Sequence, residues 1–398
     1  MTVLEVPTTQ RPVRRTPRRP KDLTPDDALM LVASGLGSVA LCWLVFTRFT
    51  DGVGWFGFLV AAVGTFLLLY YLVNLEVHGR LVATDRVVTA VVISGAVVVL
   101  VPLLSLVIYV VAEGLPNLRP GFFVNDQTGI TPTEPATAGG GSHAIVGTIE
   151  QVGLALVFAL PLGLVTAVFL NETRSRWRRM VRIFVDAMSG IPSIVAGLFI
   201  FAVFILPFAE DIKIFSFNGL MASLALALMM LPTVTQTVSV VLRLVPDGLR
   251  EAALAMGSTR ARMVWSVVLP TARTGITTAV VLGIARIVGE TAPLFFTAFG
   301  YDLMNANPVD GSQESLPLFV FKNIRKPDQS SIDRGFVGAL VLMLIVFALF
   351  GIARYIGRDR SKATGRPRRR WFRVRPGEHL PLPDANITTI DLQEALEP

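Results

Sequence analysis

Two opposite charges interrupt an apolar stretch in the second half of the chain. Arg286 and Glu290 lie within the run Thr274–Gly300, which is long enough to cross a bilayer. Ionisable side chains inside a membrane are costly and usually mark a solute path or an internal ion pair. A spacing of four residues places both on one face of a helix, where they can pair. We therefore expect the pair either to line a solute path or to lock two helices together.

Arg286 has the chemistry to hold an oxyanion. Its guanidinium is planar, stays charged and donates two parallel hydrogen bonds to neighbouring oxygens. Glu290 would neutralise the arginine whenever the anion is absent, so that no bare cation stays buried. Thr291 follows directly and is grouped with them as a third residue of the predicted pathway.

A short polar segment, 247–270, precedes the charged run. Asp247 is expected to cap a helix whose first turn also contains Glu251, because acidic groups are favourable at the positive N-terminus. Gly257 suits the left-handed residue that ends such a helix, and one of the hydroxyl residues 258–259 can begin a second short helix. The pattern predicts two helices that meet at a glycine elbow.

Small side chains cover one side of the first of these helices. Ala252, Ala253 and Ala255 would allow the close approach of another protein. An ordinary amphipathic loop at the membrane interface is the alternative, since it can also be rich in alanine and end at a glycine.

The elements that position these residues are expected to be membrane-spanning helices. A mean hydropathy of +0.60, with 52% hydrophobic and 16% charged residues, does not fit an ordinary soluble domain. Backbone amides in lipid must be satisfied within their own segment, so the apolar runs should be helices. Besides 274–300, the candidate spans are Ala28–Phe46, Gly52–Leu75, Val87–Ala112, Gln151–Leu170, Ala187–Ala209, Ile214–Leu242 and Gly335–Ala353. The predicted fold is an all-α polytopic membrane protein with eight spans.

Charge distribution orients these spans. With both termini inside, 28 of the 36 lysines and arginines fall in inside segments, which is the asymmetry that directs insertion. The net charge of +7 is therefore better explained by topology, with the basic stretches 11–21 and 366–375 near anionic lipid, than by nucleic-acid binding. Cys42 is the only cysteine, so neither an internal disulfide nor a cysteine metal cluster is expected.

Four parts follow from this pattern. They are a disordered basic cytoplasmic tail (1–27), an accessory transmembrane hairpin with its linker (28–85), a six-span core (86–357) and a cytoplasmic tail (358–398). Within the core, Gly190 and Pro192 are expected to break the fifth span. The sixth span has a polar edge that would serve helix packing or line a path, formed by Thr233, Thr235, Gln236 and Thr237.

The spacing of the polar segment resembles a known signature. Glu251-Ala252-Ala253, then Gly257, then Val267-x-Leu269-Pro270 is similar to the EAA motif of ABC-importer permeases, with valine at 267 where isoleucine is usual. The resemblance implies a type I importer core in which the segment 247–270 supplies the coupling helix that docks in a groove of an ATPase. It carries the docking role to Glu251, Ala252, Ala253 and Gly257.

A second resemblance concerns the charged run itself. Arg286-Ile-Val-Gly-Glu290-Thr291-Ala-Pro-Leu294 resembles the RxxGETAPL segment of phosphate permeases of the PstA type. The same family resemblance extends to GGGSHAIVGT (139–148), FLNE (169–172), SGIPSIVAGLF (189–199) and Ser315-Leu316-Pro317. It covers the chain from Arg86 to about Gly357 and leaves the hairpin and the C-terminal tail without a counterpart.

The resemblance implies a transporter subunit rather than an enzyme. It implies a heterodimer with a second permease of the PstC type, two ATPase subunits of the PstB type, an external phosphate-binding protein of the PstS type, and a bacterial plasma-membrane location. ATP and Mg²⁺ would bind the ATPase subunits, because this chain has no Gly-Lys pair and hence no P-loop. Three alternatives stay open: another oxyanion such as sulfate or molybdate, a gradient-driven secondary transporter or channel, and a scaffold or sensor subunit.

Overall fold

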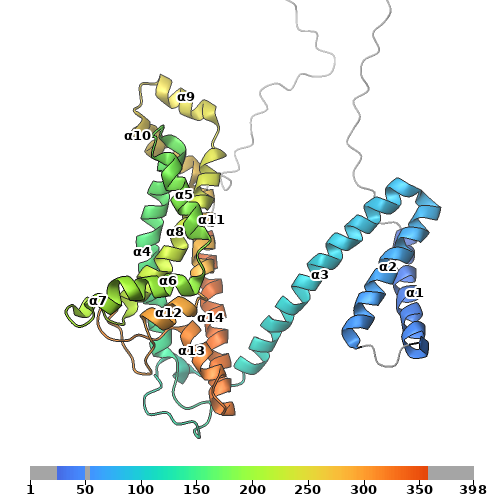
Figure 1. Cartoon of the computed structure of the whole chain (residues 1–398), viewed down its shortest axis with the longest axis horizontal. Coiled ribbons are helices and arrows are strands. Elements are labelled where there is room, and N and C mark those ends of the chain that lie inside the picture. The colour runs from blue at the N-terminus through green and yellow to red at the C-terminus, as the bar shows by residue number, and fades with distance from the viewer. Residues whose placement is uncertain (1–24, 50–53, 357–398) are drawn as a thin grey trace, which may run out of the picture. The chain divides into compact units, whose positions relative to one another are not determined.

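A computed structural model describes residues 25–49 and 54–356. Within them the chain is helical (Figure 1). The helices are α1 (Pro25–Phe49), α2 (Trp55–His78), α3 (Arg80–Gly114), α4 (Ser142–Glu172), α5 (Arg178–Ser189), α6 (Ser193–Ile200), α7 (Leu206–Phe208), α8 (Gly219–Arg243), α9 (Asp247–Ala255), α10 (Arg260–Met263), α11 (Leu269–Ile287), α12 (Ala292–Thr297), α13 (Leu316–Ile324) and α14 (Gln329–Ile356). The predicted tails fall almost entirely outside the described residues.

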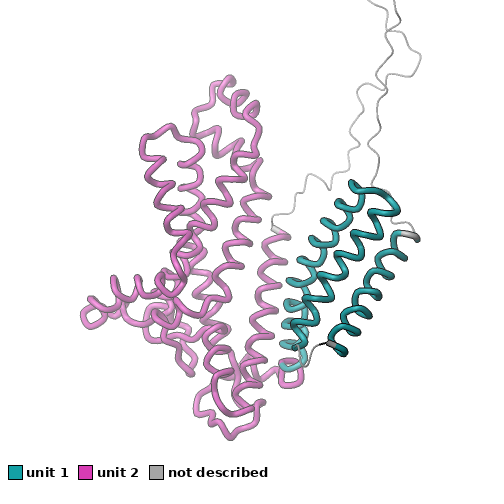
Figure 2. The backbone as a smooth tube through the Cα atoms, turned by 45° about the vertical axis from the view of Figure 1, so that its right-hand side comes forward, with its two compact units in different colours: residues 1–113 teal, residues 114–398 magenta. Residues whose placement is uncertain are grey.

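The all-α membrane architecture is confirmed. Seven helices in the described ranges are long and apolar enough to cross a membrane, and the bent pair α5–α6 brings the number to eight if it counts as one span. By its contacts the chain forms two compact units, 1–113 and 114–398 (Figure 2). This division places most of α3 with the first unit, whereas the sequence suggested a boundary at Arg86.

A polar contact holds the helices of the first unit together. The Arg86 guanidinium pairs with the Asp27 carboxylate at 2.5 Å and donates a hydrogen bond to the Asn74 side-chain oxygen at 2.6 Å. Asn74 is fully buried, so its amide needs this partner in an apolar setting. The contact joins α1, α2 and α3, and its two ionic residues lie 59 positions apart in the sequence.

The core of the second unit lies among α4, α8 and α11. Small buried residues at this contact let the helices approach closely, as in other membrane bundles. Thr235 is one of the small residues at the contact: it is fully buried, and its hydroxyl lies 3.4 Å from the carbonyl of Gly163 on α4. Of the two roles left open for the polar edge of α8, helix packing therefore fits Thr235.

The predicted break in the fifth span is confirmed. Helices α5 and α6 meet at an angle of 108° across residues 190–192, where Pro192 removes a backbone donor. Figure 1 shows α6 crossing the direction of α8. A Cβ added at Gly197 would lie 2.6 Å from the Cα of Pro293, so only glycine lets α6 approach α12 this closely.

The last part of the core differs from the sequence prediction. The span expected over 274–300 is replaced by a helical segment over Arg260–Ile287, which includes a π-helical turn at Val264–Val268. The second helix of the polar segment therefore continues into α11. Arg260, Arg262 and Arg273 hid this continuity, because charged residues are not typical of a membrane span.

A buried carboxyl group anchors the loop between α12 and α13. The Glu314 side chain is 1% exposed, and its Oε2 accepts a hydrogen bond from the Lys322 ammonium of α13 at 2.8 Å. Burial raises the pKa of Glu314 to about 7, while the positive charge of Lys322 works in the opposite direction. This folded loop thus contains a carboxyl group whose pKa lies close to neutral pH.

The contribution of Glu314 to the stability of the assembled complex should therefore fall as the pH rises from about 4.5 to about 7. The pKa of Glu314 is higher in the folded chain than its ordinary value of 4.5, so the folded state binds more protons in this window. The contribution is roughly 3 kcal/mol at 1.36 kcal/mol per pKa unit, present below the window and lost above it. Thermal unfolding should show the wild type losing stability relative to Glu314→Gln as the pH rises across this range.

Asp310→Asn provides the control for this measurement. Asp310 is an exposed acid in the same loop, so its replacement should leave the pH dependence of unfolding unchanged. If the Glu314→Gln and wild-type curves run parallel from pH 4.5 to 7, Glu314 does not carry this effect.

Candidate functional site

The charged run does not form one continuous helix. Helix α11 ends at Ile287, residues 288–291 form a turn, and α12 begins at Ala292. Proline explains the break: in an unbroken helix the ring of Pro293 would meet the carbonyl of residue 289 and would leave that carbonyl without a donor. A glycine at position 289 weakens the helix further.

This break separates the two predicted partners. Arg286 lies in the last turn of α11 with an exposed side chain, and half-buried Glu290 lies beyond the helix end. The structure has no hydrogen bond or ion pair from either side chain to any described residue. The prediction that Arg286 and Glu290 share a helix face and pair within the chain is therefore wrong. Instead, the Arg286 guanidinium is exposed at the end of α11 and has no partner among the described residues.

Thr291 faces a different space. Together with Gly289 it contributes to a cavity of about 350 Å³, whose other walls come mainly from α13. The guanidinium of Arg325 lies over the ring of Phe321 on that side, with 4.9 Å between its central carbon and the ring centroid. Arg286 does not line this cavity, so the structure does not bring the three predicted pathway residues into one site within this chain.

The glycine elbow of the polar segment has the predicted geometry. Gly257 has a φ of +81°, which is the left-handed region that ends a helix. Thr259 then caps α10, since its hydroxyl oxygen accepts a hydrogen bond from the Arg262 amide at 3.3 Å. Asp247 differs from the prediction: it is the first residue of α9 rather than its cap, and Pro246 precedes it without a side-chain hydrogen bond.

The four predicted docking residues do not all face outward. Glu251, Ala252 and Gly257 are exposed, whereas Ala253 is half-buried and packs against the hydrophobic core of the second unit. Figure 1 shows α9 at one end of the helices of this unit. The free surface of α9 is therefore built around Glu251 and Ala252, and Ala253 belongs to the face that holds α9 on the bundle.

A residue that sequence reasoning missed holds helix α9 in place. The Arg250 guanidinium donates to the carbonyls of Leu242 and Val245 at 2.7 and 2.6 Å. It also pairs with Glu172 at 3.1 Å and with Asp247 at 2.9 Å. The Arg250 and Glu172 side chains are 16% and 10% exposed, so this contact is largely shielded from water. Arg250 thus joins α9 to the ends of α4 and α8.

Loss of this contact should loosen α9 on the bundle. In Arg250→Ala the largely buried Glu172 loses its charge partner and two carbonyls lose a donor, which costs about 3–5 kcal/mol for a buried pair. We expect α9 to detach from α4 and α8, so that amide hydrogen exchange of α9 becomes at least about tenfold faster. Glu172→Gln should give the same defect more mildly, because the amide still accepts a hydrogen bond.

Exposed Arg262 on α10 offers a matched control. Arg262→Ala removes a charge from the same polar segment, 247–270, without touching α4, so amide hydrogen exchange of α9 should stay at the wild-type rate. An unchanged exchange rate in Arg250→Ala would contradict the role of Arg250 in holding α9.

Comparison with known proteins identifies the family. Residues 159–362, about half of the chain, match the family model described as binding-protein-dependent transport system inner membrane component. The chain belongs to this family. The matched residues contain the broken span, helix α9 and the helix break after Arg286.

Individual relatives agree with this assignment. The chain is 37% identical over 264 residues to the phosphate transport system permease protein PstA 1 of Mycobacterium tuberculosis (strain H37Rv), covering 66% of this chain and 83% of the relative. It is also 37% identical over 273 residues to PstA of Mycobacterium leprae, covering 68% and 88%. A solved bacterial ABC transporter involved in alginate import aligns with a TM-score of 0.48 at 15% identity, over 69% of this chain and 97% of that chain. The sequence relationship, not this structural alignment, establishes the family.

Proposed function

We propose that this chain is the transmembrane permease subunit of an ATP-driven phosphate importer. The observation that carries the proposal is its relationship to permeases named for phosphate transport, at 37% identity over about two thirds of the chain. The multi-pass helical architecture supports it, as does a coupling helix whose free surface is available to another protein.

The functional complex would contain several other chains. A second permease of the PstC type would complete the pathway, two ATPase subunits of the PstB type would bind ATP and Mg²⁺, and an external protein of the PstS type would deliver phosphate. This assembly would lie in a bacterial plasma membrane. The present chain would supply half of the pathway and no ATPase site of its own.

Coupling requires two states of the permease that the ATPase binds unequally. Closure of the ATPase dimer would move α9, and Arg250 would transmit this movement to α4 and α8 through its contacts with Glu172 and Leu242. Helix α11, which leads directly from the coupling segment, would carry the same movement to Arg286. The guanidinium would contact the passing anion, and Glu290 would provide a nearby opposite charge.

Reconstitution provides the test. The complex purified with its companion chains should move labelled phosphate into proteoliposomes only when the ATPase side has ATP and the binding protein is present. A proton gradient without ATP should not support uptake. Excess sulfate and molybdate should compete weakly with labelled phosphate. Uptake by this chain alone would contradict the proposal. Strong competition by sulfate or molybdate would indicate that the transported anion is one of these instead of phosphate.

A further inference from the structure

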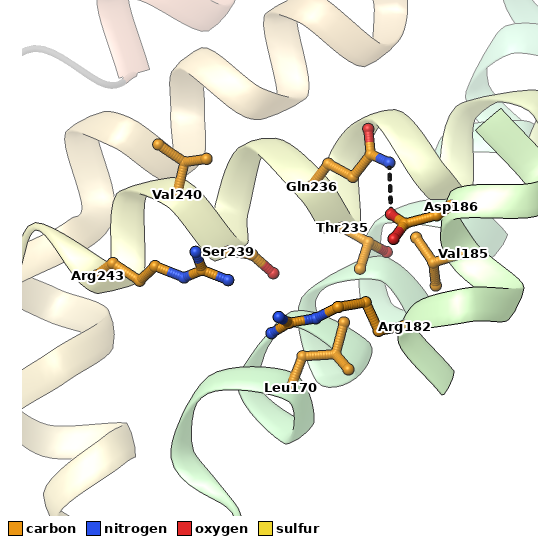
Figure 3. A pocket seen from close by; sticks show the side chains of 9 residues that line it. All are labelled: Leu170, Arg182, Val185, Asp186, Thr235, Gln236, Ser239, Val240 and Arg243. Carbon is orange, nitrogen blue, oxygen red and sulfur yellow. Dashed lines mark hydrogen bonds between the residues drawn. The ribbon is translucent and has the colours of Figure 1, made fainter. Parts of the chain in front are cut away.

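A second polar site lies between α4, α5 and α8, away from the helix break. It is a pocket of about 200 Å³. Its lining consists of Leu170, Arg182, Val185, Asp186, Thr235, Gln236, Ser239, Val240 and Arg243 (Figure 3). Arg243 is the last residue of α8 and lies four positions before the coupling helix, so under the predicted topology the pocket opens toward the cytoplasmic end of the unit.

Two arginines give this pocket a positive charge. Figure 3 shows the guanidinium groups of Arg182 and Arg243 approaching Ser239 from different sides. Arg182 has no hydrogen bond or ion pair with any residue that the structure describes. In Arg243 only the Nε has a hydrogen-bond partner among the described residues: it donates to the Asn171 side-chain oxygen at 3.2 Å. The terminal nitrogens of both arginines therefore stay available to a ligand.

The carboxylate in the pocket does not neutralise both arginines. The Oδ1 of Asp186 accepts a hydrogen bond from the Gln236 amide at 3.2 Å and forms no ion pair with Arg182 or Arg243. Two guanidinium groups and one carboxylate leave a net charge of +1. Arg243 is exposed and Arg182 is half-buried, so this positive charge can attract an anion that approaches the pocket.

Ser239 supplies a second, independent indication of a ligand. Ser239 as a whole is 8% exposed, and its side-chain hydroxyl is buried without a hydrogen-bond partner among the described residues. Ser223 on the same helix instead donates to the carbonyl four residues earlier, at 2.6 Å. Buried hydroxyls nearly always have a partner, so the free Ser239 hydroxyl in a positive pocket indicates a missing acceptor.

We propose that this pocket binds a phosphate group, held by Arg182, Arg243 and the Ser239 hydroxyl. A tetrahedral oxyanion accepts several charge-assisted hydrogen bonds at once, and guanidinium groups suit it because of their planar donor geometry. The group belongs either to free phosphate at the exit of the pathway, a source that rests on the proposed function, or to the headgroup of an anionic lipid. In both cases the ligand joins α5 to α8 next to the coupling helix.

The purified complex in nanodiscs of neutral phosphatidylcholine allows the two sources to be distinguished. In one arm, equilibrium dialysis measures the binding of labelled inorganic phosphate without the external binding protein. In the other, native mass spectrometry measures the retention of added phosphatidylglycerol. Ser239→Ala and Arg182→Gln should both weaken the binding of the same ligand, whichever of the two the pocket holds. The expected loss is at least about tenfold, the effect of losing one charge-assisted contact.

Arg179→Gln is the matched control, because Arg179 is an exposed arginine of α5 that does not line the pocket. It should bind both ligands as the wild type does. Loss of phosphate binding in the pocket variants assigns the site to free phosphate, and loss of phosphatidylglycerol assigns it to a lipid headgroup. The comparison uses Ser239→Ala and Arg182→Gln complexes that still co-purify with the other subunits. If these complexes bind both ligands as well as Arg179→Gln does, the proposal is overturned.

Failure of this site and failure of the proposed function can be told apart. Arg286→Ala should keep the binding that Ser239→Ala loses, since Arg286 does not line the pocket. A complex that binds phosphate or phosphatidylglycerol here but does not transport phosphate contradicts the proposed function alone.

Discussion

Arg286→Ala should abolish phosphate uptake while leaving the complex assembled. Arg286 has no partner among the described residues and is exposed in this chain, so its removal leaves no unpaired carboxylate behind and should not disturb folding. If its guanidinium meets the anion inside the membrane, loss of a bidentate charged contact should reduce uptake at least about 100-fold. Uptake of labelled phosphate, normalised to the amount of assembled complex, measures this effect.

Two companion variants sharpen the test. Arg286→Lys keeps the charge but loses the planar fork, so we expect partial uptake. Glu290→Gln should be milder than Arg286→Ala, because the helix break keeps the two side chains from forming an ion pair in this structure. Wild-type uptake by Arg286→Ala would rule out the pathway role, and equal loss in both variants would indicate a pair formed in another state.

Glu251→Arg should release the ATPase from the membrane subunits. Glu251 and Ala252 lie on the exposed surface of α9, whose position on the bundle depends on Ala253 and Arg250 instead. Charge reversal at Glu251, or a bulky side chain in Ala252→Trp, should therefore disrupt docking without unfolding the permease. We expect ATPase recovered by co-purification to fall at least about tenfold, with uptake lost in proportion.

Glu210→Arg is the corresponding control, since it reverses an exposed acidic charge outside the coupling segment. It should retain the ATPase fully. Ala253→Trp is a poor probe of docking, because a bulky residue there would also disturb the packing of α9 on the bundle. Normal ATPase recovery with both Glu251→Arg and Ala252→Trp would reject the docking assignment.

Local signals in the sequence were sufficient for most of the helices of this protein, although not for the break between α11 and α12. Long apolar runs predicted the membrane helices, Gly190 and Pro192 predicted the bent span, and Gly257 predicted the left-handed elbow. Each of these features depends on a few neighbouring residues: on hydrogen bonds within a helix, on a missing proline donor, or on the backbone freedom of glycine. The family motifs are also short runs of neighbouring residues, so they can be recognised in the sequence alone.

Tertiary structure decided which side chains meet. Pro293 could have predicted the break after Ile287, but the four-residue spacing of Arg286 and Glu290 suggested a pair that the break prevents. The contact between Arg250 and Glu172 joins residues 78 positions apart, and the phosphate-group pocket combines side chains from three helices. Such contacts depend on how helices pack against one another, and helix packing is set by the shapes of whole surfaces rather than by any short stretch of sequence.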